Sequence, residues 1–289
     1  MLPSRFEYHR AGTMEEAFSL LATHGDEAKV LAGGQSLIPM MKLRFASPGH
    51  LVDVNHIGGL DGIEERDGVL RIGALVRHNT LAASEVINAR YPTIAAAAPM
   101  IADPLVRNLG TIGGSLAHAD PAGDLGSVML SLGGSVVLKS ATGERTVPIA
   151  DFLVDTFTTS IRPDELLTEI QVPMASGRSG GTYLKLERKV GDFATVGVAV
   201  SVDLSNGTIG RAGIGLTGVG LKNIQASEAE ASLAGATPGD DAYAQAGRLA
   251  AAASNPVTDV RGSEEYKRHM VEVYVQRGLA RAVETANAA

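Results

Sequence analysis

Leu31-Ala-Gly-Gly-Gln-Ser36 and Thr111-Ile-Gly-Gly-Ser115 are the two stretches that decide how this chain is interpreted. Each contains adjacent glycines followed by a polar or hydroxyl residue. Because glycine lets the backbone turn sharply and approach a ligand closely, successive amides of such a loop can point at one anion. Two loops of this kind predict a diphosphate clamped between two domains. Ordinary tight turns are the alternative for either pair taken alone.

A third glycine-rich stretch, Gly213-Ile-Gly-Leu-Thr-Gly218, matches the G-x-G-x-x-G pattern of dinucleotide-binding folds. That pattern requires a strand before it, a helix that begins inside it and an acidic residue about 20 positions later. Here the stretch itself alternates like a strand, and Val219-Gly-Leu221 continues it. We therefore interpret it as a strand and not as a nucleotide site.

The residues around the first loop predict a β-α-β unit within positions 1–55. Phe6 and Tyr8 open a strand, and Thr13-x-x-Glu16 is a capping box before a helix that Gly25 ends. Further strands are expected at 29–32 and 51–54, on either side of the first loop.

Two further regions follow. The first has predicted strands at 69–74, 135–139 and 167–172 and predicted helices at 80–87, 91–101 and 124–132. Residues 173–181, rich in glycine and serine, are the predicted linker. Beyond it, Asn206-Gly207 predicts a hairpin between strands 196–204 and 209–216, and Ser263 is expected to cap a long amphipathic terminal helix. The predicted domains are residues 1–57, 58–175 and 178–289.

The composition excludes several classes of function. A net charge of −7 argues against a nucleic-acid partner, and the absence of cysteine excludes disulfides, a thiolate nucleophile and an iron–sulfur cluster held by this chain. The 7 histidines are dispersed, without a spacing that indicates a metal. No apolar run approaches the ~20 residues of a membrane span and the start is unlike a signal peptide, so we expect a cytoplasmic protein.

Three longer stretches resemble one protein family. Residues 31–44 and 101–121 look like the two FAD loops of the medium subunits of molybdenum hydroxylases, the xanthine dehydrogenase family, and most of all its carbon monoxide dehydrogenase members. Residues 185–195 are similar to the segment near the flavin, and the similarity extends over essentially the full length. The resemblance implies an α+β fold of the vanillyl-alcohol-oxidase/xanthine-dehydrogenase flavoprotein type. Two α/β subdomains would clamp FAD, followed by a C-terminal α+β domain.

The resemblance also implies site residues. The FAD diphosphate would be wrapped by Ala32, Gly33, Gly34, Gln35 and Ser36 of the first loop and by Thr111, Ile112, Gly113, Gly114 and Ser115 of the second. Asp124 would accept a hydrogen bond from a cofactor hydroxyl or amine; a helix N-terminal carboxylate is the alternative. Lys185 would place positive charge near the flavin, with a solvated lysine as the alternative. Phe193 would cover the isoalloxazine ring, and His118 is expected beside the cofactor as a structural residue.

Three positions depart from the carbon monoxide dehydrogenase pattern. Gln35 stands where that subunit often has His, Ser115 where Asn is common, and Phe193 where it has Tyr. The first two changes keep polar groups, and phenylalanine keeps the apolar ring without the hydroxyl. FAD binding is therefore still expected, whereas a specific assignment to carbon monoxide oxidation is weakened.

The resemblance implies that the reaction is divided among three kinds of subunit. A large subunit would hold molybdopterin and oxidise the substrate, and a small iron–sulfur subunit would carry [2Fe–2S] clusters. This chain would pass electrons from the clusters through FAD to a quinone, NAD⁺ or another acceptor, without catalytic residues or a metal of its own. We expect a dimer of heterotrimers, which could associate as a complex with the inner face of the membrane. A self-contained FAD oxidase or dehydrogenase and a non-enzymatic nucleotide-binding module are the alternatives.

Overall fold

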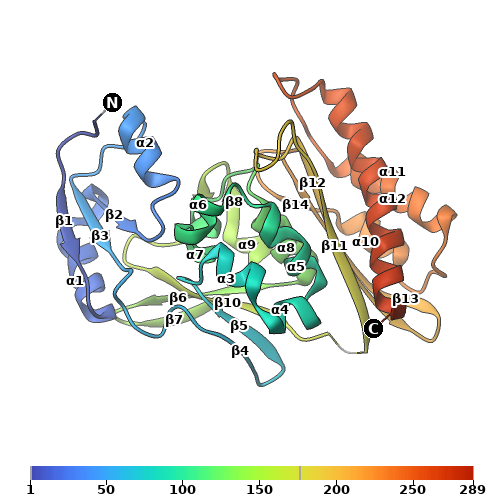
Figure 1. The fold of residues 1–289 in the computed structure, drawn as a ribbon, viewed down its shortest axis with the longest axis horizontal. Helices are drawn as coiled ribbons and strands as arrows, with labels where there is room; N and C mark the ends of the chain where they lie inside the picture. The colour runs from blue at the N-terminus through green and yellow to red at the C-terminus, as the bar shows by residue number, and fades with distance from the viewer. Residues whose placement is uncertain (1, 176, 289) are drawn as a thin grey trace.

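The computed structural model describes residues 2–175 and 177–288 as three units that follow one another along the long axis of the molecule (Figure 1). Each unit is built around its own β-sheet, and a two-stranded ribbon accompanies the middle sheet. The described residues contain no helix that is both long and apolar enough to cross a membrane.

The first unit is the predicted β-α-β arrangement. Its parallel sheet has the order β1-β3-β2. Thr13 Oγ1 accepts a hydrogen bond from the Glu16 amide, as the capping box predicts, and the helix ends at Gly25. The elements are β1 (Glu7–Arg10), α1 (Met14–His24), the 3₁₀ turn η1 (Gly25–Glu27), β2 (Ala28–Leu31), α2 (Leu37–Leu43) and β3 (His50–Asp53).

The middle unit is an antiparallel sheet of order β4-β5-β10-β6-β7 with helices packed against it. Its strands are β4 (Ile63–Arg66), β5 (Val69–Gly73), β6 (Ser135–Ser140), β7 (Gly143–Pro148) and β10 (Leu166–Pro173). The two edge strands β4 and β7 were not predicted from the sequence pattern. Both are rich in charged residues, which are common on edge strands and hide the apolar alternation of a strand.

The other elements of the middle unit include the predicted helix at 124–132. They are α3 (His78–Ala83), α4 (Glu85–Arg90), α5 (Pro92–Ala97), the 3₁₀ turn η2 (Ala98–Met100), α6 (Pro104–Leu109), α7 (Ile112–His118), α8 (Asp124–Leu132), α9 (Ile149–Phe152), β8 (Leu153–Asp155) and β9 (Thr158–Thr159).

The third unit is an antiparallel sheet of order β11-β12-β13-β14, with α11 and α12 on the side opposite α5 and α8 (Figure 1). The predicted hairpin is confirmed, because Asn206 and Gly207 have φ angles of 51° and 80° between β12 and β13. Ser263 Oγ caps the last helix by accepting from the Tyr266 amide. The elements are β11 (Arg178–Leu186), β12 (Val196–Ser205), β13 (Thr208–Thr217), β14 (Ile224–Gln225), α10 (Ser227–Leu233), α11 (Asp240–Ala253) and α12 (Glu264–Ala288).

The third glycine-rich stretch is a strand, as interpreted, because it lies mostly in β13. A Cβ atom on Gly213 would stand 1.8 Å from the Ser131 carbonyl oxygen, and one on Gly215 would stand 2.0 Å from the Ser127 carbonyl oxygen. Both carbonyls belong to α8. These glycines therefore let α8 lie directly on the sheet.

The predicted linker is wrong over most of its length. Pro173 ends β10 and Arg178 begins β11, and Ser176 lies outside the described residues. A Cβ on Gly180 would meet the Ala282 carbonyl oxygen at 2.0 Å, and one on Gly181 would meet Thr93 Oγ1 at 2.0 Å. The glycines in this stretch thus serve close packing against two helices, whereas the sequence pattern indicated flexibility.

Candidate functional site

A cleft of about 670 Å³ lies between the first unit and the helices of the middle unit, and residues from β11 and the 191–193 segment also line it. Its volume is within the range of small-molecule and cofactor sites. The structure brings all but one of the predicted site residues to this cleft: Ala32, Gly33, Gly34, Gln35, Ser36, Thr111, Gly113, Gly114, Ser115, His118, Asp124, Lys185 and Phe193. Ile112 is the exception, because its side chain is fully buried in the core of the middle unit.

The first glycine segment is a true loop between β2 and α2. Gly34 has a φ of 71°, a conformation that favours glycine. A Cβ on Gly33 would stand 2.4 Å from the Leu109 carbonyl oxygen, so the loop packs directly against the end of α6. The backbone amides of residues 33–36 donate to no acceptor among the described residues, whereas the Gln35 side chain donates to the Gly33 carbonyl oxygen. The loop therefore presents a set of unused donors at the edge of the cleft.

The second glycine segment is not a loop, contrary to the prediction. Thr111 is the N-cap of α7, and its Oγ1 accepts from the Gly114 amide at 3.1 Å. The Ile112 and Gly113 amides donate to Val76 and Ala74 carbonyl oxygens, and the Ser115 amide donates to the Thr111 carbonyl oxygen. Gly-Gly is unfavourable inside a helix, which is why the sequence pattern indicated a turn.

The two glycine segments nevertheless face each other. A Cβ on Gly114 would stand 3.9 Å from Ala32 Cβ, and Gly114 itself is exposed. Free amides are thus concentrated on the first segment. The second segment offers a surface without side-chain bulk and the hydroxyl of Ser115.

A polar network that was not predicted from the sequence holds the first loop in place. Asn55 Nδ2 donates to the Ala32 carbonyl oxygen at 2.8 Å and to Asp53 Oδ1 at 2.7 Å. Arg77 donates to Asn55 Oδ1 at 2.7 Å and to the Leu109 carbonyl oxygen. The network ties the first unit to the middle unit beside the cleft. A sequence signal existed, because Asp53 and Asn55 stand at the carboxyl end of a predicted strand.

The Asp53 carboxylate in this network is held ionised. Tyr8 OH donates to its Oδ2 at 2.5 Å, and the Asn55 amide donates to its Oδ1 at 2.8 Å. Burial opposes ionisation, but the hydrogen bonds from Tyr8 and Asn55 outweigh it and lower the pKa of Asp53.

A buried charge cluster forms another wall of the cleft. The Lys185 side chain is 1% exposed, and its Nζ donates to Asp124 Oδ2 and to the Met100 carbonyl oxygen, both at 3.0 Å. Tyr183 OH donates to Asp124 Oδ1 at 2.6 Å. Glu187 Oε2 lies 3.6 Å from Lys185 Nζ. Lys185 is therefore not a solvated lysine.

The same contacts engage both carboxylate oxygens of Asp124 within the protein. Burial raises the pKa of Asp124, although Lys185 and Tyr183 both favour its charged form. Burial also raises the pKa of Tyr183 well above its ordinary value, and the neighbouring Asp124 adds to this effect. The arrangement fixes the position of one ammonium group at the cleft.

The comparisons with known proteins agree with this geometry. The family model of the FAD binding domain in molybdopterin dehydrogenase matches residues 4–175, and that of the CO dehydrogenase flavoprotein C-terminal domain matches residues 181–282. The chain belongs to this flavoprotein family.

Two curated relatives match over nearly their whole length. The chain is 42% identical to the carbon monoxide dehydrogenase medium chain of Hydrogenophaga pseudoflava, over 96% of this chain and 97% of that one. It is 41% identical to the 6-hydroxypseudooxynicotine dehydrogenase complex subunit alpha of Paenarthrobacter nicotinovorans, over 99% and 97%. It is therefore an FAD-binding medium subunit of the carbon monoxide dehydrogenase-like molybdenum hydroxylases, an oxidoreductase component.

Solved structures confirm the predicted fold class. A chain of carbon monoxide dehydrogenase from Hydrogenophaga pseudoflava superposes with a TM-score of 0.96 at 43% identity, covering 99% of both chains. A chain of quinoline 2-oxidoreductase from Pseudomonas putida 86 superposes with a TM-score of 0.92 at 29% identity, again covering 99% of both.

The residues of the cleft fit FAD in this flavoprotein. The first loop offers unused amides to a diphosphate, the glycines keep both walls free of side chains, and Lys185 adds one cation. Phe193 is 54% exposed beside the cleft. Arg261 donates to the Phe193 carbonyl oxygen and to Asp192 Oδ1, both at 3.0 Å, so the backbone carrying this ring is anchored. The hydrogen bond from Arg261 also lowers the pKa of Asp192.

His118 lies at the last turn of α7 and also lines the cleft. Its ring packs against that of Phe157, with centroids 5.0 Å apart. Burial lowers its pKa, although Asp120 acts in the opposite direction. His118 is therefore a packed residue at the wall of the cleft.

Proposed function

We propose that this flavoprotein binds FAD non-covalently in the cleft and carries electrons between partner iron–sulfur clusters and an external acceptor. The observation that carries the proposal is the pair of facing glycine segments, one of which has unused amides. The diphosphate would lie against residues 33–36, with Gly114 and Ser115 opposite. When bound, FAD supplies the redox chemistry, and the chain supplies binding, orientation and charge.

Lys185 would supply fixed positive charge to the cofactor. Its ammonium is buried at the cleft wall between Asp124 and Glu187, so it cannot swing into solvent without leaving both carboxylates uncompensated. Asp124 would then act mainly by positioning Lys185, since both of its oxygens accept hydrogen bonds from the protein. This differs from a direct contact between Asp124 and the cofactor.

The electrons would come from partner subunits. The chain has no cysteine, so it cannot hold a thiolate-ligated cluster, and a [2Fe–2S] small subunit and a molybdopterin large subunit are therefore the proposed partners. The segment 188–193 is the proposed contact surface beside the cofactor. Val190 is 95% exposed there, next to the exposed cations Arg188 and Lys189. Three further points remain predictions. They are electron transfer to a quinone, NAD⁺ or another acceptor, assembly as a dimer of heterotrimers, and a cytoplasmic location, with or without association of the complex with the membrane.

FAD binding is tested on the purified chain by acid precipitation. The yellow colour should move to the supernatant if binding is non-covalent, as proposed; the chain has no cysteine that could form a thioether to the flavin. Colour that stays with the pellet would show covalent attachment and contradict the proposal. A colourless protein that also fails to bind added FAD would remove the proposed site.

Electron entry is tested by rapid mixing of substrate with the assembled complex. Lys189→Glu should slow flavin reduction while leaving FAD content and cluster reduction intact, because it reverses charge on the proposed contact surface. Lys139→Glu is the matched control, since Lys139 lies on β6, away from the cleft. Equal rates in both variants would eliminate the 188–193 segment as the entry point.

A self-contained FAD oxidase is the remaining alternative; membership of the flavoprotein family argues against a non-enzymatic module. An experiment that distinguishes the two proposals is to mix the isolated FAD-loaded chain anaerobically with carbon monoxide or an N-heterocycle. We expect the flavin to stay oxidised until the partner subunits are added. Direct bleaching of the flavin by substrate would favour the oxidase.

A further inference from the structure

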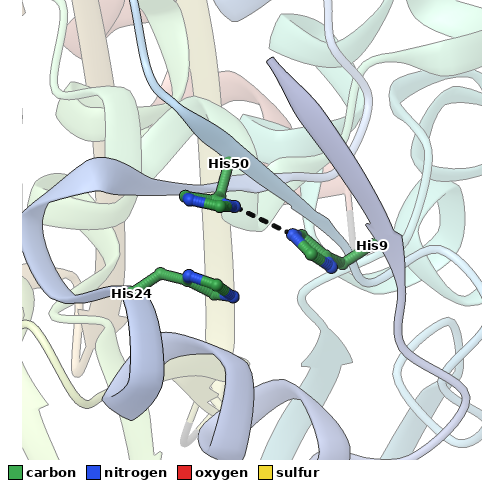
Figure 2. Close-up of side chains that lie close together, drawn as sticks. All are labelled: His9, His24 and His50. Carbon is green, nitrogen blue, oxygen red and sulfur yellow. Dashed lines mark hydrogen bonds between the residues drawn. The ribbon is translucent and has the colours of Figure 1, made fainter.

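Three histidines that are far apart in the sequence converge in the first unit. His9 lies in β1, His24 is the last residue of α1, and His50 is the first residue of β3. Figure 2 shows the His24 and His50 rings stacked, with centroids 3.7 Å apart, and a hydrogen bond between His9 Nε2 and His50 Nδ1 at 3.0 Å. Each residue offers one nitrogen, and these nitrogens lie within 4.8 Å of one another.

Strand register explains the convergence. Glu7 pairs with His50 across the parallel strands β1 and β3, so Glu7, His9 and His50 share one face of the sheet. Helix α1 packs against the same face through Leu21, which lies in one cluster with Val52. The helix therefore ends with His24 above the strand pair. The dispersed spacing of the histidines predicted no metal, because the sequence does not show this register.

The local charges favour a cation. Glu7 Oε2 lies 3.6 Å from His50 Nδ1 and 3.9 Å from His9 Nε2, and Glu27 Oε2 lies 3.9 Å from His50 Nε2. The carbonyl end of the α1 dipole, at His24, adds partial negative charge.

We propose that His9, His24 and His50 bind one divalent transition-metal ion of the zinc, nickel or copper class, with Glu7 or Glu27 available as a further ligand. Imidazole groups suit these ions, whereas magnesium and calcium prefer oxygen ligands. Two nitrogens on one zinc ion stand at most about 4.2 Å apart, because each bond is about 2.1 Å long. Metal binding would require the rings to rotate out of their stacked arrangement until the three nitrogens reach this spacing. Both side chains reach the surface in part, with exposed fractions of 23% for His9 and 17% for His50.

This site is separate from the FAD cleft, because none of the three histidines lines the cleft. A bound ion would join β1, α1 and β3. Of these, β3 pairs with β2, the strand that leads into the first glycine loop, and α1 also contacts β2. The site would therefore act as a clamp on the unit that carries the first loop.

The test uses the full chain with FAD bound, produced without a polyhistidine tag and titrated with zinc sulfate by calorimetry. We expect one zinc ion per chain, and zinc should raise Tm. His24→Gln and His50→Gln should each weaken binding by at least about tenfold, since even the loss of a group that supports a ligand costs about 10–100-fold. His269→Gln is the control, because His269 is an exposed histidine on α12.

FAD content reports whether each variant is folded, and His9→Gln replaces any variant that loses FAD. Magnesium chloride should not bind at the site. The proposal is overturned if the wild-type chain binds no zinc, if folded histidine variants bind zinc as tightly as the wild type, or if only the His269→Gln control loses binding.

Discussion

Replacing Gly33 with alanine is expected to weaken FAD binding. The added Cβ would stand 2.4 Å from the Leu109 carbonyl oxygen and 2.7 Å from Gly110 Cα. Ordinary contact begins at 3.4 Å, so the first loop must retreat from α6 by 3.4 − 2.4 = 1.0 Å. Overpacking of this kind costs about 1–3 kcal/mol. If FAD requires the loop in its present position, the same free energy appears in binding, as an increase in Kd of about 5- to 150-fold.

The assay is a titration of the FAD-free chain with FAD, followed by flavin fluorescence, together with urea unfolding of the FAD-free protein. Gly62→Ala is the matched control, because a Cβ at Gly62 would meet no atom within 4 Å. If the loop keeps its position in the FAD-free variant, the strain lowers the free energy of unfolding. If the loop retreats and relieves the strain, the Kd of FAD rises. If Gly33→Ala matched the control within about twofold in Kd, with the same free energy of unfolding, the close-packing argument would be refuted.

Further predictions concern buried polar groups. Burial lowers the pKa of His78 to about 4, below its unfolded value of about 6.5, so the unfolded chain binds the proton more readily and the free energy of unfolding falls as the pH drops from 6.5 towards 4. Urea unfolding should show a loss of about 2 kcal/mol between pH 7 and pH 5, and His78→Gln should abolish this loss. Lys185→Met leaves Asp124 buried without its cation and should cost about 3–5 kcal/mol in the free energy of unfolding, part of which adding Asp124→Asn restores. Asn55→Ala leaves the Ala32 carbonyl oxygen without its hydrogen-bond donor, so the free energy of unfolding should fall by about 1–3 kcal/mol and the Kd of FAD should rise. An unchanged Kd would show that Asn55 does not position the loop for FAD.

Much of the cofactor site was predictable, but its local structure was not. The sequence located both glycine segments, and all but one of the predicted residues line one cleft. It did not reveal that Thr111 caps a helix whose amides donate within the protein. That depends on Val76 and Ala74, two carbonyl acceptors that belong to another part of the chain.

What the sequence determined by itself was local. The Thr13 cap, the Gly25 stop and the Asn206-Gly207 turn each involve residues within a few positions of one another, so their chemistry can be recognised before folding. The long stretches at 31–44 and 101–121 also carried the family resemblance, and with it the α+β fold that solved structures bear out.

Only the tertiary structure decided which distant groups meet. The pairing of Lys185 with Asp124, the bond from Asn55 to Ala32 and the cluster of His9, His24 and His50 all join separate elements. These contacts depend on strand register and on how helices pack on sheets, and a shift of one residue would turn each strand side chain to the opposite face. Glycines at close contacts were equally unpredictable, because the sequence shows that a side chain is absent but not which neighbouring group occupies the space.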